Sequence, residues 1–224
     1  MNLVGETLLW LADPLHWTGP DGIPTRLAQH VGLTVAVIAI ASAIALPIGA
    51  WMGHTRRGEV TIATLVNGSR ALPTLGLVTL FALWLGIGVR APIIALVILA
   101  VPSIVAATYS GISSASRPAV EAARALGHTS WQTLSRIEAP LAMPTIGGGL
   151  QSALLQVVAT ATIAAYVADV GLGRYIFAGL KSRDYPEMLA GSVLVILLAL
   201  VVTAAAAGVG RLYRRLTNPE RTPE

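Results

Sequence analysis

The chain contains 224 residues, of which 54% are hydrophobic and 12% are charged, and its mean hydropathy is +0.71. This composition excludes an ordinary soluble domain and indicates one integral membrane domain. The absence of cysteine excludes disulfides, thiolate chemistry and cysteine-based zinc sites. The net charge of +4 would suggest a nucleic-acid partner for a soluble protein, but here the arginines lie in short loops between apolar runs, where membrane topology explains them. We therefore expect no nucleic-acid partner.

Residues 1–30 are expected to form an extracytoplasmic N-terminal segment. They lack the basic start of a signal peptide, and they carry three acidic residues against one arginine, a balance that permits translocation. Two alternatives are open. Residues 3–11 form a short interfacial helix with Trp10 and Trp17 at the level of the lipid headgroups, or the segment is loosely ordered, because Pro and Gly residues break the pattern that follows.

Residues 31–53 form the first predicted span, since about 20 apolar residues cross a hydrocarbon core of roughly 30 Å. Pro47 should kink this helix. The loop at residues 54–59 carries two arginines, which places it in the cytoplasm by the positive-inside rule. The second span is expected within residues 60–85, where a polar stretch and Pro73 interrupt the apolar run.

Arg70 is the one clear charge inside a predicted span. Burying a guanidinium at mid-membrane costs at least about 2.5 to 3.5 kcal/mol, so the side chain needs water, carbonyls or a polar partner. In one interpretation residues 60–67 lie along the membrane surface, and Arg70 reaches cytoplasmic water. In the other, Pro73 frees carbonyls beside Arg70, and the two residues form part of a gate that disfavours leakage of cations.

The third predicted span, residues 92–109, leads to an arginine-bearing insertion at residues 116–140. Two short helices are expected in this insertion. Gly127 suits the left-handed position that follows a helix end, and Thr129 begins a capping-box pattern for the second helix. Pro140 is expected to stop that second helix.

The fourth predicted span, residues 141–168, carries Ser152, Gln156 and Thr160 at intervals of four residues. A polar stripe within lipid must face protein or water. The stripe therefore makes hydrogen bonds to other helices or forms a wall of a translocation path. The outside loop that follows, residues 169–187, is a candidate surface for an external partner.

The fifth predicted span, residues 188–209, precedes a basic cytoplasmic tail at residues 211–224. With these assignments nine basic residues lie inside and five outside, which favours an external N-terminus and an internal C-terminus. Residues 31–210 then form one transmembrane domain with about five helices.

Several kinds of chemistry lack the residues they require. The only lysine, Lys181, follows a leucine and not a glycine, so the chain has no Walker A motif and any ATPase must be a separate chain. No His, Asp or Glu falls clearly inside a predicted span, which argues against a membrane-embedded hydrolase and a proton-coupled carrier. The four scattered histidines are expected to be structural or surface residues. We therefore expect a non-catalytic chain without a metal or cofactor of its own.

One pattern in the insertion resembles the EAA motif of ATP-binding-cassette importer permeases. Its residues are Glu121, Ala122, Ala123, Gly127, Ile137 and Pro140. The resemblance implies that residues 116–140 are the coupling helices, which dock into a cleft of a cytoplasmic ATPase, and that the fold is that of a type I importer permease. Ala139 stands where the family usually has leucine, which weakens one packing contact.

Five further stretches are similar to permeases that import osmoprotectants such as glycine betaine, choline and carnitine. They are residues 70–76, 108–112, 137–144, 161–166 and 171–173. The resemblance implies a bacterial cell membrane, a second permease subunit that is identical or paralogous, and two ATPase subunits that bind ATP and Mg²⁺. It also implies a substrate-binding protein outside the cell, which selects the solute.

Two departures from the family stand out. Arg70 occupies a position where many relatives have Gln, and Asp169-Val170 replaces small residues. Two other functions stay open on sequence alone. One is a permease for methionine or another amino acid, and the other is a membrane scaffold or channel subunit that does not transport.

Overall fold

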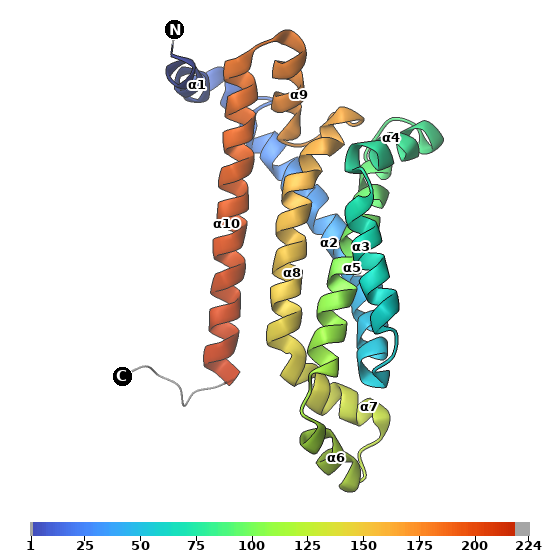
Figure 1. Ribbon diagram of the computed structural model, residues 1–224. Coiled ribbons are helices and arrows are strands. Elements are labelled where there is room, and N and C mark those ends of the chain that lie inside the picture. The colour runs from blue at the N-terminus through green and yellow to red at the C-terminus, as the bar shows by residue number, and fades with distance from the viewer. Residues whose placement is uncertain (1, 218–224) are drawn as a thin grey trace.

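The computed structural model describes residues 2–217, and the regular structure within them is entirely helical. Long helices run lengthwise through an elongated bundle, with α1 at one end and the α6–α7 pair at the other (Figure 1). Within the described residues, four segments are long and apolar enough to cross a membrane, and one bent helix pair makes a fifth. The prediction of an all-α membrane protein with about five spans is confirmed.

The helices are α1 (Leu3–Ala12), α2 (Ile23–Thr55), α3 (Glu59–Ala71), α4 (Thr74–Leu85), α5 (Arg90–Ser113), α6 (Arg117–Ala125), α7 (Ser130–Thr133), α8 (Ala139–Ala161), α9 (Gly173–Ser182) and α10 (Tyr185–Thr217). Two 3-10 turns, η1 (Pro14–Trp17) and η3 (Thr162–Tyr166), and one π turn, η2 (Leu134–Glu138), complete the regular structure of residues 2–217. Because α1 is a regular helix, the loosely ordered alternative is wrong for its residues.

Helix α2 begins eight residues earlier than the sequence predicted. Pro24 lies in its first turn, where proline presets the helical φ and the missing N–H has no partner to lose, so this proline starts the helix and does not break it. As a result His30 lies inside the apolar helix, and the expectation that no histidine falls within a span is wrong.

The second predicted span is two helices that meet at an angle of 84°. Leu72 and Pro73 are extended between α3 and α4, because a proline disfavours helical geometry at the residue before it. The polar residues before Arg70 do not interrupt α3, which continues to Ala71. Helix α3 runs beside α5 along the bundle (Figure 1).

Pro140 does not stop the second coupling helix, so that prediction is wrong. The chain continues as one helical segment from Ser130 to Tyr166. The π turn just before the proline explains this continuity, since Ala139 N–H bonds to the Leu134 carbonyl five residues back. The wider turn removes the usual conflict between a proline ring and the preceding helical carbonyls.

The core is formed by α2, α5 and α8, whose buried faces are rich in alanine and valine. Small residues let helix backbones approach closely, which drives association in membranes. At Gly149 of α8, a Cβ would lie only 2.0 Å from the Cβ of Ala107 on α5. These three helices form one tightly packed unit.

Helix α10 packs mainly against α1, α8 and α9 and lies outside this unit (Figure 1). A second apolar cluster joins it to α2 and α9 through Ile23, Tyr175 and Leu198. The helix extends past the predicted span into residues assigned to the tail, while Arg221 of that tail lies outside the described residues.

Candidate functional site

Helices α6 and α7, the predicted coupling helices, project from the end of the bundle (Figure 1). Helix α6 is amphipathic and buries Val120 and Ala123, whereas Glu121 and Ala122 are exposed. Two of the three residues in the Glu-Ala-Ala pattern are therefore open to a partner, and the third packs inward to hold α6 in place.

Gly127 adopts the left-handed conformation that the sequence predicted, with φ +84°. Its N–H donates to the Arg124 carbonyl at 2.9 Å, and His128 N–H donates to the Ala123 carbonyl at 3.1 Å, which is the Schellman pattern of a helix end. A Cβ at Gly127 would meet no atom within 4 Å. The requirement for glycine here is therefore conformational and not steric.

The predicted capping box at the start of α7 is present. Thr129 Oγ1 accepts from Gln132 N–H at 3.3 Å, and Gln132 Oε1 accepts from Thr129 N–H at 2.8 Å. These bonds satisfy backbone donors at the exposed tip of the molecule. The turn between α6 and α7 is thus fixed on both sides.

Two large apolar side chains at this tip remain exposed: Leu126 by 82% and Trp131 by 73%. Leu134, three residues after Trp131, packs inward against the helix bundle. The sequence analysis did not select Leu126 as a site residue. Its position at the end of α6, directly before the turn at Gly127, could have indicated an exposed apolar side chain.

The base of the coupling helices holds a buried acid that the sequence analysis did not select. Glu138 is 2% exposed, and its Oε2 lies 2.5 Å from Nδ1 of His54, at the end of α2. Ile137 beside Glu138 is half-buried, and Pro140 is exposed.

The polar stripe of α8 faces away from the core of its own chain. Ser152 and Gln156 are exposed, and Thr160 is half-buried, whereas residues 153, 157 and 161 pack into the core. Thr160 Oγ1 donates to the Gln156 carbonyl of the same helix at 2.7 Å. Within residues 2–217 the stripe makes no hydrogen bond to another helix, so its remaining polar groups are available to a second chain or to water.

Arg70 and Pro73 lie on the two sides of the bend between α3 and α4, and both are exposed. In the described part of the chain the guanidinium of Arg70 has no hydrogen bond or ion pair. One of the two interpretations of Arg70 required residues 60–67 to lie along the membrane surface, across the end of the bundle. Because α3 runs along the length of the bundle, these residues do not have that orientation (Figure 1).

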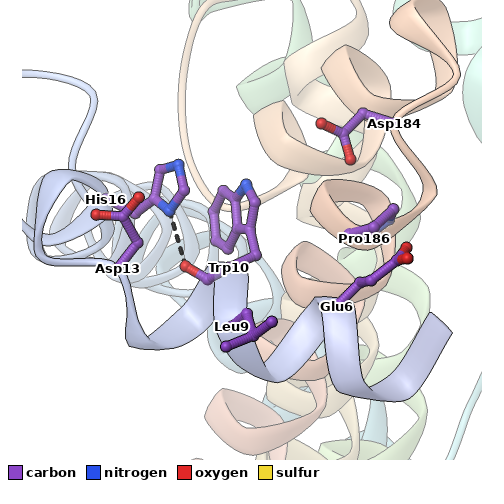
Figure 2. A pocket seen from close by; sticks show the side chains of 7 residues that line it. All are labelled: Glu6, Leu9, Trp10, Asp13, His16, Asp184 and Pro186. Carbon is purple, nitrogen blue, oxygen red and sulfur yellow. Dashed lines mark hydrogen bonds between the residues drawn. The ribbon is translucent and has the colours of Figure 1, made fainter. Parts of the chain in front are cut away.

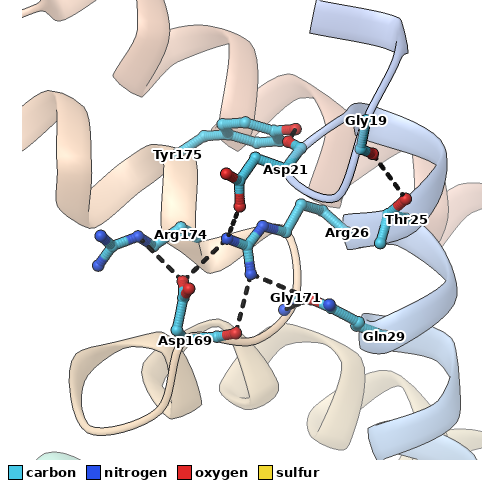
Figure 3. A network of polar contacts seen from close by, with 9 residues as sticks. All are labelled: Gly19, Asp21, Thr25, Arg26, Gln29, Asp169, Gly171, Arg174 and Tyr175. Carbon is cyan, nitrogen blue, oxygen red and sulfur yellow. Dashed lines mark hydrogen bonds and ion pairs between the residues drawn. The ribbon is translucent and has the colours of Figure 1, made fainter.

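The opposite end of the bundle carries a polar network around Arg26, which is 3% exposed (Figure 3). Its guanidinium donates to Asp21 at 2.5 Å, to the Asp169 carboxylate at 2.9 Å and to the Asp169 carbonyl at 2.8 Å. Gln29 accepts from Arg26 and from Gly171 N–H. The network joins α2 to the loop after α8.

Tyr175 of α9 adds a further bond to this network, since its hydroxyl donates to the Asp21 carbonyl at 2.6 Å. Burial raises the pKa of Tyr175 to about 12, although the charge of Arg26 opposes the rise. The hydroxyl therefore keeps its proton, and its hydrogen bond, at neutral pH.

A shallow pocket lies beside this network, between α1 and the start of α10 (Figure 2). Three acids line it with Trp10, which stacks on His16 at a ring distance of 3.9 Å. His16 Nδ1 lies 2.7 Å from the Trp10 carbonyl, which fixes the imidazole. The acids are Glu6, Asp13 and Asp184.

The predicted site residues thus form three separate places: the coupling tip, the stripe on α8 and the bend between α3 and α4. They are not a single catalytic constellation.

Residues 45–218 match the family described as the inner membrane component of binding-protein-dependent transport systems. The chain is 31% identical over 189 residues to a carnitine transport permease protein of Listeria monocytogenes, covering 84% of this chain and 85% of that protein. It is 28% identical over 177 residues to a glycine betaine/carnitine/choline transport system permease protein of Bacillus subtilis, covering 79% and 82%.

Among solved structures, a chain of the MetNI methionine transporter in an inward-facing conformation matches with a TM-score of 0.74. That match has 21% sequence identity and covers 90% of this chain and 98% of the other. An amino acid ATP-binding-cassette transporter matches with a TM-score of 0.67 at 17% identity, covering 96% and 98%. These likenesses show a shared fold and do not identify a solute.

Proposed function

The chain belongs to the family of inner membrane components of binding-protein-dependent transport systems, and we propose that it is the permease subunit of an importer for small osmoprotectants. The observation that carries this proposal is the family match over residues 45–218, which includes the coupling helices, the stripe and most of the bundle. Glycine betaine, choline and carnitine are the solutes in the names of the relatives with high coverage.

The exposed coupling tip is the surface that we assign to the ATPase. Glu121 offers a carboxylate, Ala122 permits close approach of a partner backbone, and Leu126 and Trp131 offer apolar surface that binding would bury. ATP and Mg²⁺ would then be bound by that partner, and this chain would be non-catalytic. The tip accordingly lies in the cytoplasm.

With the tip inside the cell, the Arg26 network and the pocket beside α1 lie outside, where the substrate-binding protein docks. The N-terminal segment is then external and the C-terminal end of α10 internal, in the plasma membrane of a bacterium. The arginine-rich loop between α2 and α3 fits this orientation by the positive-inside rule.

The stripe at Ser152, Gln156 and Thr160 faces outward from the chain, so a path between two permease subunits would have these side chains on its wall. An uncharged polar wall suits a solute that is zwitterionic or carries a fixed cation, because hydroxyl and amide oxygens can replace water without holding the solute tightly. A second copy or a paralogue would complete the path.

The proposal is tested by purifying the chain with its ATPase and binding protein and reconstituting the complex in lipid. ATP hydrolysis and uptake are then measured with glycine betaine, choline, carnitine and methionine. We expect at least one of the first three solutes to stimulate hydrolysis and to accumulate, and methionine to do neither. Stimulation by methionine alone would identify an amino acid importer, and a chain that copurifies with no ATPase would contradict transport by this route.

A further inference from the structure

The cytoplasmic end of α2 is bonded to the base of the coupling helices by His54 and Glu138. The Nδ1 atom of His54 lies 2.5 Å from Glu138 Oε2, although the residues are 84 positions apart in the chain. A carboxylate only accepts hydrogen bonds, so Nδ1 carries the hydrogen. Within the described chain this is the one side-chain hydrogen bond between α2 and residues 116–140.

The pair lies at the edge of an apolar cluster that unites the same elements. Ile112 of α5 and Ala142 of α8 are buried there, and Leu134 of the π turn packs against them. Gly53, next to His54, comes so near to α5 that an added Cβ would lie 2.7 Å from the Cβ of Ile112. The end of α2 is therefore held at one position relative to the π turn.

Stability alone does not account for this pair. Burying a carboxylate costs several kcal/mol, and a pair of well-packed apolar side chains is often as stable as a buried ion pair or more so. What a hydrogen bond adds is a fixed direction and register. Glu138 is also the last residue of the π turn, the irregular turn that connects α7 to α8.

We infer that His54 and Glu138 are positioning residues for ATP-driven transport, a role that rests on the proposed function of the chain. Their bond makes α2 move with the coupling helices. Helix α2 packs on α5 and α8 along the core, and its other end is bonded through Arg26 to the loop at Asp169. Movement at the ATPase thus reaches the external loops through one continuous helix.

The test replaces the pair by leucines, H54L/E138L, which keeps the site filled without the directional bond. A matched control, T55L/E59L, adds two leucines at exposed positions of the same end of the bundle. Assembled complexes are compared by solute transported per ATP hydrolysed. We expect a loss of roughly 2- to 30-fold for H54L/E138L, the range for residues that carry coupling, and no loss for the control.

Two single variants keep the inference testable if the double variant does not assemble. Glu138→Gln preserves an acceptor for His54 and should keep most of the solute transported per ATP hydrolysed. Glu138→Asp preserves the charge but withdraws the carboxylate by one methylene, and should lower the amount of solute transported per ATP. A wild-type amount of solute per ATP in H54L/E138L, or in Glu138→Asp where the double variant does not assemble, would overturn the inference. A wild-type complex that transports no osmoprotectant would refute the proposed function instead.

Discussion

Gly127 shows how a single backbone angle can matter more than the space around it. No neighbouring atom blocks a side chain there, yet its φ is one that residues with a Cβ rarely adopt. A β-branched residue would cost about 1 to 2 kcal/mol or would force the turn to change. The orientation of α6 relative to α7 depends on that turn.

Gly127→Val should therefore uncouple ATP hydrolysis from transport or release the ATPase. Gly127→Asn, which tolerates the left-handed region, should retain much of the coupling. Gly208→Val is the matched control, since that glycine is helical and also has open space around it. Full transport with normal ATPase association in Gly127→Val would show that the coupling assignment is incorrect.

Arg70 is a second position where substitutions distinguish two interpretations: a residue of the gate, or an anchor at the membrane surface. If its charge and hydrogen-bonding capacity serve the gate, Arg70→Gln should keep much of the transport, whereas Arg70→Leu should assemble and transport poorly. Uptake of labelled solute is measured at matched membrane levels, with Arg90→Leu as a control at another exposed arginine. Equal uptake by Arg70→Leu and the wild type would make Arg70 only an anchor at the membrane surface.

At the scale of elements, the stripe of α8 gives a pattern that cysteine labelling can read. The chain has no cysteine of its own, so each introduced thiol is the only one. Cysteines at positions 152, 156 and 160 should react with a small aqueous thiol reagent in the assembled importer, whereas those at 154 and 158 should not. The opposite pattern would mean that the stripe is packed against protein or lipid.

The elements also show what the sequence could and could not predict. Hydropathy and length are local properties, and they located the spans. The local preferences of proline and glycine indicated the break at Pro73 and the turn at Gly127. Proline was harder to interpret, because Pro24 starts a helix and Pro140 follows a π turn, two outcomes that depend on a few backbone bonds.

Bonds between distant residues could not be predicted at all. The Arg26–Asp169 contact joins positions 143 residues apart, and no local pattern relates them. The coupling pair of His54 and Glu138 is a similar case. Each of these four residues, taken alone, looks like an ordinary member of a loop or a helix end.

For the whole molecule, the Arg26 network predicts that removing the two acids and removing the arginine lower the stability of the protein by different amounts. Arg26 is buried, whereas its partners Asp21 and Asp169 are largely exposed. D21N/D169N leaves a buried cation without a counter-charge, which can cost up to about 3 to 5 kcal/mol, whereas Arg26→Met replaces that cation with an apolar group and should cost much less.

Thermal unfolding in detergent at one scan rate compares the two variants. The unfolding midpoint of D21N/D169N should be clearly the lower one. If Arg26→Met is the less stable variant, the network contributes mainly through the hydrogen bonds of the arginine and not through the balance of charge.

Helix α10 has a consequence for the lipid that surrounds the molecule. Only 6% of its 18-residue apolar window is buried within the chain. The 23 uncharged residues between Glu187 and Arg211 form a helix about 35 Å long, against a hydrocarbon core of roughly 30 Å. The excess must be absorbed by tilt or by local thickening of the bilayer, at a cost of fractions of a kcal/mol per Å of mismatch. Acyl-chain length therefore acts on this helix more directly than on the packed core, and membrane thickness becomes a variable that can tune the transporter from outside the protein.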